Sequence, residues 1–180
     1  MQLELGATVC FAIMVCLNHL ASDNWIYIFQ LVASGYASLM LLKEKQIMEK
    51  GRDTFTSKVN SMISIIGYFL FFVASFLSGH YIKGKLYIGA TFFLTLSVML
   101  KILNYITAKN RSGKKKNISK NPNKCLILAC ITAVNYCLFI SAGCESLALE
   151  NDYAALLSVA KVCNWLGVLC HGGWLYFVYI

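Results

Sequence analysis

Charged residues, proline and strand-like alternation are all scarce in this chain of 180 residues. It has one proline, and 13% of its residues are charged, whereas a soluble domain usually has about 25%. Hydrophobic residues make up 58% of the chain and form blocks of about the 20 residues that cross a bilayer. No block alternates with period two, so helices remain the way to satisfy the backbone in lipid. The sequence therefore predicts an all-α, polytopic transmembrane helical bundle.

We predict six membrane spans, at residues 3–20, 25–42, 59–79, 86–108, 124–143 and 153–180. The first block is short and carries Glu4 near its start, so a five-span chain remains an alternative. It lacks the positive start and the A-x-A site of a signal peptide. The connections are short and no linker divides the chain, so residues 1–180 are expected to form one bundle domain of antiparallel neighbours.

Small side chains indicate where the spans touch, because close backbone approach holds helices together in lipid. They recur in the second and third blocks, at Ala33, Ser34, Ala37, Ser38, Ser64, Gly67 and Ala74.

Basic residues are unevenly distributed between the loops. Of the 16 lysines and arginines, five lie in segment 43–58 and seven in segment 109–124. In segment 144–152, by contrast, all the charged residues are acidic. Short basic loops stay in the cytosol, so both basic segments are predicted to be cytosolic, and with six spans so are both termini. The acceptor-like triplets that begin at Asn110 and Asn117 are then not expected to carry glycans.

The basic cluster of Lys114, Lys115 and Lys116 has no aromatic or glycine-loop context, so nucleic acid is not an expected partner. We interpret it as a topology determinant. It also attracts anionic lipids of the cytoplasmic leaflet, by about 1 kcal/mol per basic residue near the surface. Membrane lipids and an unidentified protein are therefore the expected partners.

Metal and cofactor sites are not predicted. The eight cysteines include no CxxC pair, and His19, His80 and His171 are far apart in the sequence. A zinc site needs three or four converging ligands at about 2.0–2.3 Å. We interpret the cysteines as small packing residues.

The last block contains a polar seam. Lys161, Asn164 and His171 fall within an arc of roughly 80° on an ideal helix. Ionisable residues inside a membrane are functional candidates because burying them is costly. Lys161 could instead snorkel to the interface, and His171 could hydrogen-bond a neighbouring helix. No catalytic residue is assigned, and the seam is a hypothesis for lipid or partner contact.

Two other classes of function lack their usual residues. No carboxylate lies in the interior of a predicted span, which disfavours a proton-coupled or cation-coupled transporter. The hydrolase motifs G-x-S-x-G and H-E-x-x-H are also absent.

The last two blocks carry a resemblance to a known family. The stretches "NPNKCLILACITAVNYCLFISAG" and "ENDYAALLSVAKVCNWLGVLCHGGWLYF" resemble the Frag/DRAM/Sfk group of six-span proteins, which includes the DNA-damage-regulated autophagy modulators and a GPI-anchor-processing branch. The matching positions are Asp152-Tyr153 and Cys163-Asn164-Trp165. The third and fourth blocks are similar to the corresponding family spans. The family has a glutamate where Asn164 stands, and its long first lumenal loop is nearly absent here.

The resemblance implies a non-enzymatic protein of the lysosome, Golgi, endoplasmic reticulum or plasma membrane. Such a protein would organise lipids or recruit partners through its basic cytosolic loops. A lipid or GPI-anchor remodelling factor that uses Lys161, Asn164 and His171 is one alternative, so enzymatic activity stays open. A small channel or transporter is another.

Overall fold

The computed structural model describes residues 2–20, 26–49, 55–77, 80–111, 122–148 and 153–179. These residues form helices and no strand, as the sequence predicted. The six helices are α1 (Gln2–Leu20), α2 (Ile26–Glu49), α3 (Phe55–Phe76), α4 (His80–Arg111), α5 (Pro122–Ala148) and α6 (Tyr153–Tyr179).

Each helix contains most of one predicted apolar block, but several continue beyond it. Helix α2 runs to Glu49, past the predicted span end at residue 42. Lysine and glutamate favour helix, and Lys45 Nζ lies 3.7 Å from Glu49 Oε1 one turn on. Helix α5 begins at Pro122, a residue suited to the first helical position, where its missing N–H would have no partner. Hydropathy therefore located the apolar part of each helix rather than its ends.

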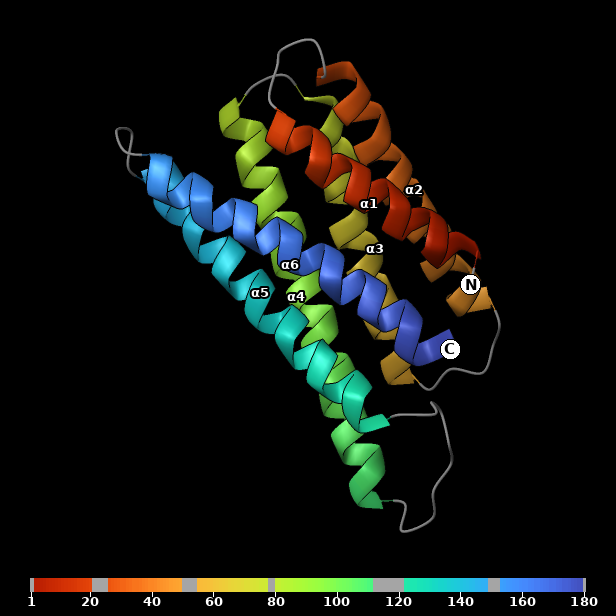
Figure 1. Cartoon of the computed structure of the whole chain (residues 1–180). Helices are drawn as coiled ribbons and strands as arrows, with labels where there is room; N and C mark the ends of the chain where they lie inside the picture. Colours follow the sequence, from red (N-terminus) through yellow and green to blue (C-terminus); the bar gives the residue numbers. More distant parts are fainter. Residues whose placement is uncertain are drawn as a thin grey trace.

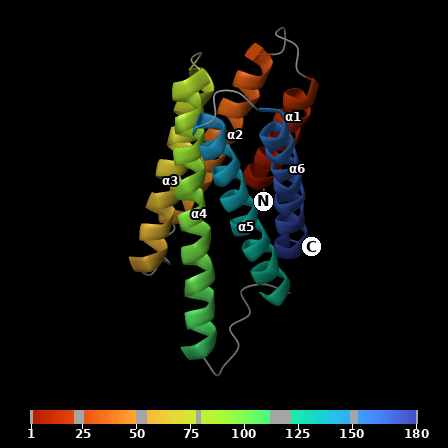
Figure 2. The ribbon, with the colours of Figure 1, turned by 90° about the vertical axis from the view of Figure 1, so that its left-hand side faces the viewer.

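The helices form a closed ring, in which each packs against its neighbours in sequence and α1 packs against α6 (Figures 1 and 2). Because successive helices are antiparallel, the end of α2, the start of α3, the end of α4 and the start of α5 lie toward one end of the ring (Figure 1). The described residues of the two basic segments, at 43–49, 55–58, 109–111 and 122–124, belong to this end. We call it the basic end.

Three of the described helical segments are long and apolar enough to cross a membrane, namely Phe55–Phe76, Ile82–Thr107 and Asn123–Ser141. Gln2–Leu17 is a shorter apolar helix. Large apolar side chains are exposed around the ring, among them Leu31, Leu169 and Val162. A patch-rich apolar exterior of this kind is suited to lipid rather than to water. The described chain is that of an integral membrane protein.

Helices α3 and α4 approach each other closely through small and polar side chains. Ser64 Oγ and Ser97 Oγ are hydrogen-bonded at 2.6 Å. One turn away, a Cβ atom on Gly67 would lie 2.9 Å from Leu94 Cγ and 3.1 Å from the Ala90 carbonyl oxygen. Glycine is therefore required at position 67 for this separation of the helices.

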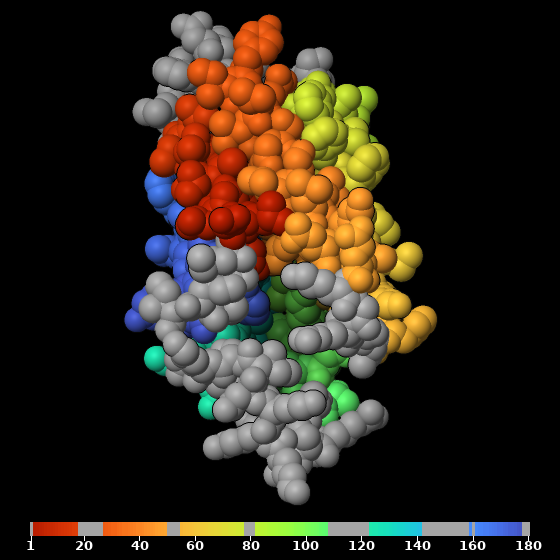
Figure 3. All heavy atoms as spheres, turned by 90° about the vertical axis from the view of Figure 1, so that its right-hand side faces the viewer, coloured from red at the N-terminus to blue at the C-terminus, as the bar shows by residue number. Residues whose placement is uncertain are grey.

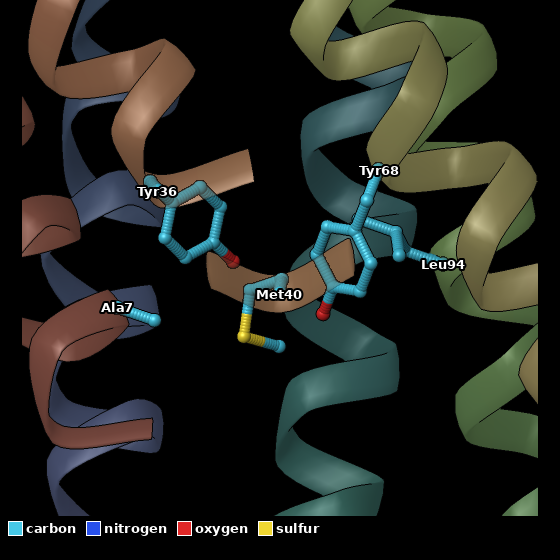
Figure 4. Close-up of a cluster of buried hydrophobic side chains, with 5 residues drawn as sticks. All are labelled: Ala7, Tyr36, Met40, Tyr68 and Leu94. Carbon is cyan, nitrogen blue, oxygen red and sulfur yellow. The ribbon is translucent and has the colours of Figure 1, made fainter. Parts of the chain in front are cut away.

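The core of the ring is aromatic. Ala7, Tyr36, Met40, Tyr68 and Leu94 are buried together, and Met40 lies between the two tyrosine side chains (Figure 4). The ring centroids of Tyr36 and Tyr68 are 6.1 Å apart in an edge-on arrangement. The small residues predicted to lie between helices are buried, with Ser38 half-buried: Ala33, Ser34, Ala37, Ser64, Gly67 and Ala74.

Candidate functional site

A cavity of about 140 Å³ lies inside the ring, and all six helices contribute to its wall. Its charged residues are Glu4, Lys43 and Lys101, which belong to the parts of α1, α2 and α4 nearest the basic end. Figure 3 shows α1 and α2 in front, with the C-terminal part of α4 visible below them. The remaining lining residues are Thr8, Met40, Tyr68, Val98, Ala129, Thr132, Tyr136, Cys170, His171, Trp174 and Leu175.

Two ion pairs define the charged end of the cavity. Lys43 Nζ lies 2.5 Å from Glu4 Oε1, which joins α1 to α2. Lys101 Nζ lies 3.8 Å from Glu44 Oε1, which joins α2 to α4. The Glu44 side chain is only 2% exposed, whereas that of Lys101 is 50% exposed. Glu44 is therefore a buried carboxylate whose counter-charge remains accessible from the cavity.

Glu44 is the residue that sequence reasoning missed. It follows the predicted second span and was therefore counted among loop residues. Because α2 continues as a helix to Glu49, the carboxylate stays between helices instead of reaching solvent. Its second oxygen, Oε2, has no hydrogen-bond partner in the described chain. A glutamate two residues beyond an apolar block, in a run of helix-forming residues, was the signal available.

His171 also lines the cavity. Its Nε2 atom is 3.3 Å from the Tyr36 hydroxyl of α2, at hydrogen-bonding distance. The ring centroid of His171 is 5.1 Å from that of Phe11 in α1. The alternative interpretation of His171, an interhelical hydrogen bond, agrees with this geometry. The histidine thus connects α6 to α1 and α2.

The other two seam residues lie apart from this cavity wall. Lys161 and Asn164 are half-buried and do not line the cavity. The buried face of α6 is formed by Cys163, Gly167 and Cys170, and Lys161 and Asn164 flank it. Lys161 and His171 are ten residues apart on one helix, about 15 Å along its axis. The polar seam is thus a border of the packed face and not a single converging site.

Asn135 is a second polar residue that the sequence reasoning did not single out. Its Nδ2 atom donates to the Cys163 carbonyl oxygen at 3.0 Å, and Asn135 is 3% exposed. A Cβ atom on Gly167 would lie 3.7 Å from Asn135 Nδ2 and 3.0 Å from Phe11 Cε1. The absence of a side chain at position 167 therefore lets α5 and α1 approach α6. An asparagine in the middle of an apolar block was the available signal.

Other predicted residues are distributed as follows. Lys114, Lys115 and Lys116 lie outside the described residues. Among the described cysteines, Cys163 and Cys170 are buried, whereas Cys16, Cys130 and Cys137 are exposed. These three cysteines are therefore not the packing residues that the sequence predicted. No group of three metal-ligating side chains is found in the described ranges.

Comparison with family models, with curated proteins and with solved structures finds no match to this chain. The site must accordingly be interpreted from its own geometry. It combines a partly open, largely apolar space with cationic and anionic groups at one end. Such a cavity is suited to holding one end of an amphipathic molecule.

Proposed function

We propose that the chain is a six-span integral membrane protein whose basic end faces the cytosol. In this proposal it organises anionic lipids of the cytoplasmic leaflet without catalysing a reaction. The observation that carries the proposal is the coincidence of two features at the basic end. In the sequence, the basic segments 43–58 and 109–124 connect α2 to α3 and α4 to α5, and these helices end or begin at the end of the ring where Lys43 and Lys101 line the cavity. The family resemblance and the endomembrane location stay predictions.

Electrostatics favour this orientation and this partner. The cytoplasmic leaflet carries anionic lipids, and each lysine or arginine near its surface contributes about 1 kcal/mol of attraction. Short loops rich in lysine and arginine are also retained in the cytosol during insertion. The same residues therefore support both the topology and the recruitment of anionic lipid. Salt will weaken this attraction by screening, because the Debye length at about 0.1–0.15 M ionic strength is about 8–10 Å.

Catalysis is not part of the proposal. The residues suggested for remodelling chemistry, Lys161 and His171, are about 15 Å apart along α6 and cannot act on one bond together. The His171 ring is engaged with Tyr36 and Phe11.

A coupled transporter is the second candidate, and one specific observation favours it. Glu44 is a buried carboxylate paired with Lys101, and paired ionisable groups inside membrane proteins commonly belong to proton or ion pathways. Proton or cation flux into liposomes by the purified protein, abolished by Glu44→Gln, would favour this candidate over lipid organisation.

The topology gives the first testable prediction. A short epitope placed after Lys115 is expected to be cleaved by protease in intact microsomes, because the proposal places that loop in the cytosol. An epitope placed between Glu150 and Asp152 is expected to be protected until the membrane is permeabilised. Protection of the epitope at Lys115, or a glycan at Asn117, would contradict the proposed orientation.

The basic loop that contains Lys114, Lys115 and Lys116 gives the second testable prediction. Replacing Lys114, Lys115 and Lys116 together with glutamine is expected to reduce the anionic lipid that co-purifies with the protein by about half or more, because roughly 3 kcal/mol of surface attraction is lost. The measurement is mass spectrometry of lipid retained after mild detergent extraction from membranes of known composition.

The matched control replaces the same three lysines with arginine, which keeps the charge. This variant is expected to retain lipid as the natural chain does. Equal lipid retention in the glutamine and arginine variants would mean that the cluster only sets topology.

A further inference from the structure

The cavity inside the ring changes character along its length. Glu4, Lys43 and Lys101 lie toward the ends of their helices, at the basic end. Farther from those ends the wall includes Met40 and Val98, together with tyrosine and histidine. An amphipathic molecule would match this gradient if its charged group stayed at the basic end and its apolar part entered the ring.

The polar groups of the inner wall are mostly engaged elsewhere. The Thr8 hydroxyl donates to the Glu4 carbonyl oxygen at 2.8 Å, and the Thr132 hydroxyl donates to the Leu128 carbonyl oxygen at 2.8 Å. His171 is paired with Tyr36. A buried water needs two to four polar partners. The inner wall is therefore better suited to carbon than to ordered water.

Charge at the cavity entrance selects the sign of the head group. Lys43 is held at 2.5 Å by Glu4. Lys101 is 3.8 Å from Glu44, which is beyond ordinary hydrogen-bond length, and its side chain is half exposed. An ammonium group has three N–H donors, so those of Lys101 that do not face Glu44 can bind an anion while the pairing with Glu44 is kept. The exposed lysines Lys45, Lys58 and Lys124, on the described parts of α2, α3 and α5, add to the positive potential at this end.

We propose that the cavity binds a single-chain anionic amphiphile, with a phosphate or carboxylate at Lys101 and the end of the apolar chain among Met40, Val98 and Ala129. The volume is about 140 Å³, close to that of engineered protein cavities of about 150 Å³ that hold benzene. About six carbon atoms of the chain therefore fit inside the ring. This site goes beyond lipid recruitment by the loops because it lies inside the bundle and does not use residues 114–116.

The test uses Trp174, which lines the cavity, as a reporter. The chain has three tryptophans, so Trp25→Phe with Trp165→Phe leaves Trp174 alone. This protein is placed in phosphatidylcholine nanodiscs and titrated with bromooctyl phosphate, whose bromine quenches tryptophan on contact. We expect saturable quenching, which inorganic phosphate does not displace.

Two variants remove the two halves of the site. Glu44→Gln with Lys101→Gln removes the cation without leaving a buried charge, and is expected to raise the half-saturation concentration about tenfold. Ala129→Leu fills the space for the chain and is expected to abolish saturable quenching. The matched controls are Lys45→Gln, at an exposed lysine outside the cavity lining, and Val134→Leu, on the exposed face of α5. Neither control should change the titration.

Three results would overturn the proposal. Quenching that rises linearly and equally in every variant would mean partition into the bilayer only. Displacement by inorganic phosphate at equal concentration would mean a site for free phosphate. Unchanged saturation in Ala129→Leu would place the chain outside the ring. Repeating the titration with Lys114, Lys115 and Lys116 replaced by glutamine separates this proposal from the proposed function. The cavity is expected to bind the amphiphile as before in this variant, even if the loops do not recruit lipid.

Discussion

Replacing Lys101 with methionine is expected to lower the free energy of unfolding by about 3 kcal/mol. The substitution leaves Glu44, which is 2% exposed, without its counter-charge between α2 and α4. Removing one partner of a buried ion pair costs about 3–5 kcal/mol, and the half-exposed lysine places the effect at the lower end. The measurement is reversible unfolding in mixed micelles as the fraction of denaturing detergent is raised.

Two variants serve as controls: the single substitution of the partner, Glu44→Gln, and the double variant that changes both residues. Glu44→Gln leaves Lys101 unpaired but half exposed, so we expect a loss well below that of Lys101→Met. The double variant Glu44→Gln with Lys101→Met should regain most of the stability, because no charge is left buried. Equal losses in the two single variants, with no recovery in the double, would show that the pair is not coupled through burial.

Replacing Gly67 with alanine is expected to destabilise the bundle by about 1–3 kcal/mol, the usual cost of overpacking. The new Cβ atom would meet Leu94 Cγ at 2.9 Å and the Ala90 carbonyl oxygen at 3.1 Å. The leucine can rotate, but the backbone oxygen can move only if α3 and α4 separate. Separation would also lengthen the 2.6 Å hydrogen bond between Ser64 and Ser97.

A second glycine of the same interface provides the control. A Cβ atom on Gly89 in α4 would lie 3.8 Å from Leu70 Cδ1, which is ordinary contact. Gly89→Ala is therefore expected to be neutral or to stabilise by up to about 1 kcal/mol, the helix-propensity gain of alanine over glycine. If Gly67→Ala stabilises the protein to the same extent, the close approach at position 67 is not required. Unfolding in mixed micelles compares both variants.

The sequence was informative where a property depends on a single helix. Apolar blocks located all six described helices, and three of these helices are long and apolar enough to cross a bilayer. Small residues in the second and third blocks correctly indicated positions such as Ala37 and Gly67 where helices touch. Both signals are local, so no knowledge of the neighbouring helix was needed.

The sequence was uninformative where a property depends on which helices meet. Glu44 was taken for a loop residue, because the apolar block ends at the first charged residue. The helix itself continues to Glu49. His171 was recognised as unusual, but its partner Tyr36 is 135 positions away in the chain. The cavity depends on the contact between α1 and α6, for which the apolar pattern contains no signal.

That contact has a consequence for how the protein is assembled. During synthesis α1 leaves the ribosome before the other described helices and α6 leaves after them, yet these two must meet to complete the ring. Until α6 is in place, Phe11 has no His171 ring beside it. The cavity also lacks the part of its wall that α6 contributes between Cys170 and Leu175. The earlier helices must therefore remain an incomplete arc until then, with their aromatic inner surface exposed to whatever surrounds the unfinished ring.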